Sequence, residues 1–255
     1  MCGIGGFVDY ERDARTFRAT AQRMKRTLTP RGPDAEGDYH DPDALLVHRR
    51  LIVIDPEGGR QPMYSPDGNT ILIYNGELYN TEEIRRELLA HGHRFTGHSD
   101  TEVLLHAFLE WDTDAFARLN GIFAFAIWQK KERRLVLCRD RLGVKPLFTA
   151  HTDAGLVFGS TIGTVLCHPA VEPVVDADGL RSVLLLGPAR PPASGVFRQI
   201  DSLLPGHYAV LTPEHYIDRA YWKLEAHEHE DDLPATIART HELICDATQR
   251  QLVSD

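Results

Sequence analysis

The chain begins Met1-Cys2-Gly3-Ile4-Gly5-Gly6, and the rest of the sequence is organised around this stretch. If Met1 is removed, Cys2 carries a thiol and a free α-amine on one residue. The thiolate is the reactive form of sulfur, and an amine with a pKa of about 8 accepts protons near neutral pH. One residue then supplies both a nucleophile and a general base. A free thiol without chemical consequence is the alternative, and these six residues alone do not decide between them.

The composition is that of a globular protein. The 255 residues allow one large domain, or one domain and part of another. Hydrophobic residues make up 42% and charged residues 25% of the chain, which is ordinary for a soluble protein. The net charge of −9 argues against a nucleic-acid partner. No apolar run approaches about 20 residues and no signal peptide is recognisable, so we expect neither a membrane span nor export.

Cysteine usage indicates a reduced compartment. The four cysteines, at positions 2, 138, 167 and 245, are too scattered for a disulfide framework and form no Cys-x-x-Cys pair. We therefore expect no structural metal, although the chain has 13 histidines. A cytoplasmic protein is the resulting prediction.

The order of apolar and polar segments predicts a layered α+β domain with antiparallel sheets. Strands and helices come in blocks and do not strictly alternate. Two helices are predicted to begin with capping boxes at Asn80 and Ser99, and the acidic segment 225–232 is typical of a linker. The sequence predicts strands at 3–9, 44–54 and 70–74, hairpins at 122–139, 147–158 and 196–210, and further helices at 16–28, 162–167, 178–186 and 235–253.

Two arginines interrupt the predicted strand 44–54. Charges inside an apolar strand are costly unless they are paired. A guanidinium matches a carboxylate in shape, so one of Arg49 and Arg50 could bind a substrate carboxylate while the other points to solvent. Arg31, in the turn Arg31-Gly32-Pro33-Asp34, could close over an anion or cap the preceding helix, and the local pattern favours the cap.

Polar residues after strand 70–74 leave two interpretations open. Asn75-Gly76 is a common turn pair, yet a side-chain amide beside a glycine N–H can also form an oxyanion hole. Glu77 would then be placed to meet a cation. Asp100 opens a helix, where an acid complements the helix dipole or holds a substrate ammonium.

Many motifs occur together and in a fixed order. They are Met1 to Gly6, Arg31-Gly32-Pro33-Asp34, His48-Arg49-Arg50-Leu51, Gln61-Pro62-Met63, Asn75-Gly76-Glu77-Leu78-Tyr79-Asn80, Ser99-Asp100-Thr101-Glu102, Asp140-Arg141-Leu142-Gly143-Val144-Lys145-Pro146-Leu147, Phe158-Gly159-Ser160, Leu204-Pro205-Gly206-His207 and Tyr221-Trp222. Over about residues 1–222 the chain resembles a class II glutamine amidotransferase, in the branch of the glutamine-hydrolysing asparagine synthetases.

The resemblance implies a fold and a division into domains. The expected fold is the N-terminal-nucleophile hydrolase sandwich, with four αββα layers and two antiparallel sheets. Residues 2–216 would form the glutaminase domain. Residues 217–255 would form a linker and the first helix of a truncated asparagine synthetase domain of the ATP pyrophosphatase type.

The resemblance also implies roles for individual residues. Cys2 would attack the amide carbon of L-glutamine, and its own amine would move the protons. Asn75 and the Gly76 N–H would form the oxyanion hole. Arg50 would bind the substrate carboxylate, while Glu77 and Asp100 hold its ammonium. The expected pocket wall is the strand end formed by Leu51, Ile52, Val53 and Ile54.

The implied synthesis lies outside these residues. In the family, ammonia reaches a synthetase domain in which ATP and Mg²⁺ activate aspartate, and that domain carries a Ser-Gly-Gly-x-Asp-Ser loop. The loop is absent here, so we expect a fragment or a split subunit, no cofactor in this chain, and a synthetase domain as partner. Assembly as a homodimer is compatible with the sequence. The alternatives are the glutaminase half of a relative that amidates another carboxylate, and a non-catalytic glutamine-binding or regulatory module.

Overall fold

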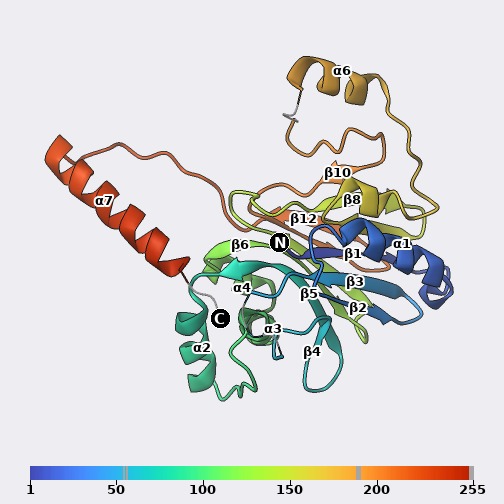
Figure 1. The fold of residues 1–255 in the computed structure, drawn as a ribbon, viewed down its shortest axis with the longest axis horizontal. Helices are drawn as coiled ribbons and strands as arrows, with labels where there is room; N and C mark the ends of the chain where they lie inside the picture. Colours follow the sequence, from blue (N-terminus) through green and yellow to red (C-terminus); the bar gives the residue numbers. More distant parts are fainter. Residues whose placement is uncertain (54, 56, 188–190, 253–255) are drawn as a thin grey trace.

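Two antiparallel sheets form the centre of the protein (Figure 1). A computed structural model describes residues 1–53, 55, 57–187 and 191–252. One sheet has the order β10 (Asp201–Ser202), β8 (Phe148–Thr152), β9 (Gly155–Gly159), β1 (Gly3–Asp9), β3 (Ala44–Arg50) and β2 (Ala35–His40). The other has the order β12 (Tyr216–Ala220), β11 (His207–Leu211), β7 (Arg134–Arg139), β6 (Gly121–Gln129), β5 (Thr70–Leu78) and β4 (Met63–Tyr64).

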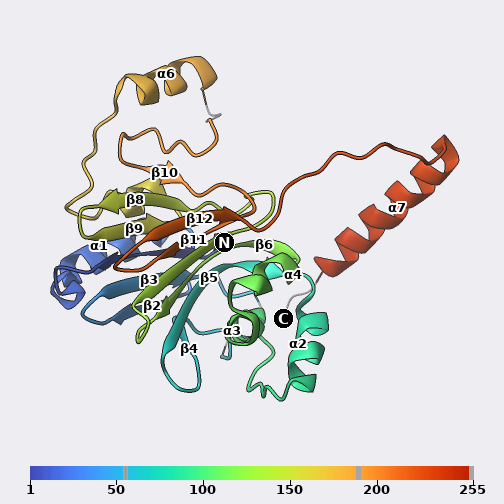
Figure 2. The same cartoon turned by 180° about the vertical axis from the view of Figure 1, so that it is seen from behind.

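Helices cover the outer face of each sheet (Figures 1 and 2). The 3₁₀ turn Ala14–Thr16 and the helices α1 (Arg18–Leu28) and α5 (Ile162–Val165) pack on the first sheet. The helices α2 (Thr81–Ala90), α3 (Asp100–Trp111) and α4 (Ala115–Arg118), with the 3₁₀ turn Asp112–Asp114, pack on the second. A third apolar cluster, which contains Ile4, Leu46, Ile73 and Trp128, fills the space between the sheets. The predicted αββα sandwich is therefore confirmed.

Strand alternation explains why β5 is apolar on both faces. Successive side chains point to opposite faces of a sheet. Ile71 and Ile73 belong to the cluster between the sheets, whereas Leu72 and Tyr74 belong to the cluster under the helices. Asn75 therefore follows Ile73 on the inner face, at the end of the space between the sheets.

The strand predicted over 44–54 ends at Arg50, so the prediction is wrong for its last residues. Both neighbouring strands reach their ends here, because Gly3 pairs with Arg49 and Ala35 pairs with Arg50. Leu51 has no ladder partner among the residues that the structure describes, and the backbone N–H of Ile52 donates to Asp34 Oδ2 at 2.9 Å. Residues 51–53 therefore lie outside the sheet, and Ile54 lies outside the described residues.

Other predicted elements differ in outcome. The hairpins at 122–139 and 147–158 are confirmed. The hairpin at 196–210 is wrong, because β10 pairs with β8 in one sheet and β11 pairs with β7 in the other. The turn alternative for Asn75-Gly76 is also wrong, since both residues lie inside β5. Their neighbours across the ladder, in β6, are Ala124 and Phe123.

The two predicted helix caps also differ. Ser99 Oγ accepts a hydrogen bond from the Thr101 N–H at 3.1 Å, as a capping residue does. The predicted capping box is nevertheless wrong, because the Glu102 carboxylate accepts from the N–H groups of Thr96 and Gly97 instead. Asn80 precedes α2 without capping it. Its Oδ1 accepts from the Asn120 N–H at 2.9 Å, and its Nδ2 donates to Arg118 O at 3.0 Å. The Asn80 side chain is thus used to join α2 to the end of α4.

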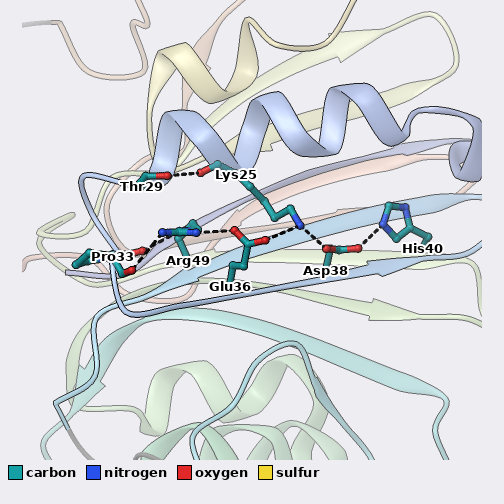
Figure 3. Close-up of polar contacts among 8 residues, drawn as sticks. Lys25, Thr29, Pro33, Glu36, Asp38, His40 and Arg49 are labelled. Carbon is teal, nitrogen blue, oxygen red and sulfur yellow. Dashed lines mark hydrogen bonds and ion pairs between the residues drawn. The ribbon is translucent and has the colours of Figure 1, made fainter.

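Charged side chains hold the segment between α1 and β2 (Figure 3). Lys25, only 4% exposed, donates to Asp38 at 2.7 Å and to Glu36 at 3.1 Å. Arg49 also pairs with Glu36, and its guanidinium donates to Gly32 O at 2.8 Å. The hydrogen bond from Lys25 lowers the pKa of Glu36, and burial opposes this only in part. Arg49 thereby points away from the space between the sheets and fixes the adjoining loop.

Two helices stand apart from the sandwich (Figure 1). These are α6 (Ala177–Leu186) and α7 (Leu233–Arg250). None of the α7 residues is buried, and Arg250 reaches Glu83 of α2 at 3.3 Å. The predicted C-terminal helix is confirmed, although Val253 lies outside the described residues. Across the described ranges, every helix is too short or too polar to cross a membrane.

Candidate active site

A cavity of about 110 Å³ opens where β1 begins and β3 ends. The antiparallel pairing of Gly3 with Arg49 brings these two strand ends to the same edge of the sheet. Cys2 and Arg50 must therefore lie side by side there. The cavity wall includes eight of the ten predicted site residues, namely Cys2, Arg50, Leu51, Val53, Asn75, Gly76, Glu77 and Asp100. Ile52 lies outside this wall, and Ile54 outside the described residues.

The Cys2 thiol is held by the chain that follows β3. Its Sγ donates to Leu51 O at 3.6 Å and accepts from the Leu51 N–H at 3.4 Å. Burial raises the pKa of this thiol, and the Leu51 N–H and the charge of Arg50 oppose the effect only in part. Near neutral pH the sulfur therefore keeps its proton, and a nearby base must take it before attack.

Arg31 has a role that neither interpretation of its turn anticipated. Its Nε donates to the backbone carbonyl of Cys2 at 3.0 Å. The guanidinium of Arg49 holds this turn, because it donates to Gly32 O and Pro33 O. The network of Figure 3 thus extends to the backbone of Cys2 through Arg31.

Two hydrogen-bond donors for which the described residues offer no partner face the cavity from β5. Asn75 is 1% exposed, and among the described residues its Nδ2 has no partner. The N–H groups of Tyr74 and Leu78 point away from β6, to Gln61 Oε1 at 2.6 Å and Asp100 Oδ2 at 3.2 Å. Gly76 lies between them, so strand alternation turns its N–H to the same side. A buried donor without a partner is costly, which indicates that Asn75 Nδ2 awaits an acceptor, and the half-buried Gly76 N–H is available to the same cavity.

Gly76 has no room for a side chain. A Cβ there would lie 2.5 Å from Ile122 O and 2.6 Å from the Phe123 Cβ. The opposite residue, Phe123, directs its own N–H and C=O to Asp140. Gly76 and Phe123 therefore form a non-hydrogen-bonded pair, which leaves the Gly76 N–H available to the cavity.

Two carboxylates, of Glu77 and Asp100, also line the cavity. Asp100 Oδ2 accepts from the Tyr74 hydroxyl at 2.9 Å and from the Leu78 N–H. Burial raises the pKa of the Asp100 carboxyl, against these hydrogen bonds, and the neighbouring Glu77 adds to the rise. A cationic ligand would offset both effects, because it stabilises the ionised carboxylates.

Arg50 is the cation at the other side of Cys2. It is 6% exposed, and its Nη2 donates to Asp55 O at 2.7 Å. A Cβ on Gly59 would lie 2.2 Å from this nitrogen, so the glycine provides its space. The arrangement can hold a zwitterion and present a carbonyl carbon to a thiol.

Sequence reasoning assigned no site role to several residues in the cavity wall. Tyr74 and Gln61 support the site through Asp100 and the β5 edge. Lys145 also lines the cavity. Its motif, Asp140 to Leu147, was recognised in the sequence, but nothing local connected it with Cys2.

Known proteins share this chain's sequence pattern. A family model described as a glutamine amidotransferase domain matches residues 1–222, so the chain belongs to the glutamine amidotransferase family. The glutamine-hydrolyzing asparagine synthetase 3 of Bacillus subtilis strain 168 is 46% identical over the whole chain. The glutamine-hydrolyzing asparagine synthetase 2 of the same organism is 31% identical, again over the whole chain. The chain spans only 42% and 36% of these two relatives.

A solved structure shares the fold. Glutamine phosphoribosylpyrophosphate amidotransferase from Bacillus subtilis superposes with a TM-score of 0.61 at 17% identity. The match covers 87% of this chain and 49% of that protein. At this identity the likeness concerns the fold alone, and it agrees with the sandwich described above.

Proposed function

We propose that this chain hydrolyses L-glutamine to glutamate and ammonia through Cys2. The observation that carries the proposal is Asn75 Nδ2, which is buried in the same cavity as the Cys2 thiol and has no partner in the described part of the chain. A buried amide donor beside a nucleophile suits an oxyanion that forms only during reaction. The match to the glutamine amidotransferase family supports the choice of glutamine.

Each step uses groups of this site. Removal of Met1 frees the Cys2 amine, which accepts the thiol proton as sulfur attacks the side-chain amide carbon. Asn75 and the Gly76 N–H stabilise the resulting oxyanion. The intermediate collapses, the amine returns a proton to the leaving nitrogen, and ammonia departs from a thioester. Water then attacks the thioester and releases glutamate and the thiol.

The remaining wall residues bind the ends of the substrate. Arg50 takes the α-carboxylate, for which a guanidinium offers paired donors. Asp100 and Glu77 take the α-ammonium, which compensates their mutual repulsion. Leu51 and Val53 form the wall beside the substrate chain.

The ammonia is used by a further domain. We propose that a C-terminal synthetase domain, on the same or a separate chain, uses it to convert aspartate to asparagine, with ATP and Mg²⁺ bound there. The names of the relatives and the share of them that this chain spans support this step. The same proposal includes a domain boundary near residue 216, a cytoplasmic location and assembly as a homodimer.

Intact mass before and after incubation with 6-diazo-5-oxo-L-norleucine tests the glutaminase proposal. This glutamine analogue alkylates a thiol that attacks it. We expect the protein to lack Met1 and to gain one adduct, located at Cys2 by peptide mapping. A processed protein that takes no adduct and releases no glutamate from glutamine would overturn the proposal.

Arg50→Ala is expected to raise the KM for glutamine about 10- to 100-fold with a smaller change in kcat, since a charge-assisted hydrogen bond to the substrate is lost. Steady-state glutamate release measures both constants. The adjacent Arg49→Ala is the matched control. Because Arg49 binds Glu36 and the loop at Gly32, the Arg49→Ala substitution should lower Tm and leave the KM for glutamine near the wild-type value. An unchanged KM in Arg50→Ala would contradict the assigned role.

A further inference from the structure

Lys145 is a buried cation in the cavity that the mechanism above does not use. It lies in the loop between β7 and β8, is 5% exposed, and shares the cavity wall with Cys2. Its backbone N–H and C=O are bonded to Asp140 and Arg139. Within the described ranges, no hydrogen bond or ion pair of its ammonium is found. A buried charge without a partner is costly, so its presence calls for a partner that arrives with the ligand.

The loop ties the backbone of Lys145 to β6, the strand that pairs with β5. Asp140 Oδ2 accepts from the Lys145 N–H at 2.9 Å and from the Phe123 N–H at 3.2 Å. Phe123 is the residue opposite Gly76 in the β5–β6 ladder. One carboxylate thus ties the Lys145 backbone to the strand position facing Gly76.

Arg50 is anchored elsewhere in the wall. It is held by Asp55 O and lies against Gly59, in the segment that follows β3. The two cations therefore come from different segments of the cavity wall, Arg50 from the end of β3 and Lys145 from the loop that Asp140 ties to β6.

The charges of the site leave Lys145 without a counterpart in bound glutamine. The substrate carboxylate is matched by Arg50, and its ammonium by Asp100 and Glu77. The side-chain amide is neutral and requires no cation. Negative charge appears at that end only during reaction, first as the oxyanion and then as the side-chain carboxylate of glutamate.

We propose that Lys145 binds this negative charge: its ammonium stabilises the anion at the reacting carbon and the side-chain carboxylate of the glutamate product. Lys145 is then a further binding residue of the glutaminase site. The inference rests on the proposed function.

The test compares two ligands that differ only at the reacting end. Calorimetry measures the Kd of L-glutamine and of L-glutamate for Cys2→Ala, which binds without turnover, and for Cys2→Ala combined with Lys145→Met. We expect the Kd of glutamate to rise about tenfold or more, because a partly buried charge pair is lost. The Kd of glutamine should change less than about threefold, since its amide carries no charge.

Two control variants accompany the test. Lys145→Arg should keep most of the affinity for glutamate, because the charge is retained. Lys130→Met makes the same chemical change at an exposed position of the β6–β7 loop and should alter neither Kd.

The outcomes separate this inference from the proposed function. Equal weakening of both ligands by Lys145→Met would show a structural role for Lys145 and overturn the inference. An unchanged Kd for glutamate would also overturn it, while glutamine binding and hydrolysis by the wild type would still support the glutaminase. Failure of the Cys2→Ala protein to bind either ligand would overturn both.

Discussion

Cys2→Ala is expected to lower glutamine hydrolysis by about 10⁴-fold or more, because the nucleophile and its thioester intermediate are both lost. The remaining oxyanion donors and binding groups cannot replace a covalent step. Glutamate release measures the rate, and thermal unfolding measures the fold, which should be retained since only one partly buried thiol is removed. A rate near that of the wild type would exclude Cys2 as the nucleophile.

The raised pKa of the Cys2 thiol leads to a second variant, which tests the base. Because burial keeps the sulfur protonated near neutral pH, the thiol alone is insufficient, and a base must accept its proton. A variant with one residue inserted between Met1 and Cys2 keeps the thiol but displaces the free amine. We expect it to be nearly as slow as Cys2→Ala. Cys245→Ala, the same change on the exposed helix α7, should keep the full rate.

Asn75→Ala is expected to lower kcat by about 10²- to 10³-fold with little change in the KM for glutamine, the usual effect of removing one oxyanion donor. Its Nδ2 has no partner among the described residues, so the substitution breaks no hydrogen bond of that nitrogen. The loss should therefore be in rate, with Tm changed by only a few degrees. Steady-state kinetics and thermal unfolding on one preparation measure both.

A second buried asparagine provides the matched control. Asn69 is 8% exposed, and it donates to Glu132 at 2.9 Å and accepts from the Lys131 N–H at 3.0 Å. Asn69→Ala should therefore lower Tm and leave kcat near the wild-type value, the reverse of Asn75→Ala. If Asn75→Ala raises KM and leaves kcat unchanged, Asn75 binds the ground state and is not an oxyanion donor.

Local patterns were sufficient for much of the fold. Alternating apolar strands, capping at Ser99 and two hairpins depend on residues close in sequence, and the sandwich follows from their order together with the family motifs. Local patterns left two interpretations open for Cys2, Arg50, Asn75 and Asp100, and the resemblance to the family assigned their roles.

The remaining features depend on contacts between distant segments. β3 ends at Arg50 because its two partner strands, β1 and β2, begin opposite Arg49 and Arg50. The residues around Leu51 carry no local signal of this. The Asn80 side chain serves Asn120 instead of its own helix, because α4 ends beside it. Lys145 enters the site through Asp140 and the register of β6, so its place was predictable only once the strands were paired.

The two proposed oxyanion donors have different origins, with a consequence for how this chemistry can be lost. The Gly76 N–H is available because, in the part of the chain that the structure describes, β4 pairs with Ile71 and Leu72 alone and no strand covers the later edge of β5. Side chains bond that edge on either side of Gly76, at Tyr74 and Leu78. No side-chain replacement elsewhere erases a backbone donor, so a descendant without Asn75 would retain a weakened activity. In a descendant with a β4 longer by a few residues, β4 would pair with the Gly76 N–H. That protein would lose activity although every reactive side chain is still present. The side chains alone would then not identify which related proteins keep glutaminase activity.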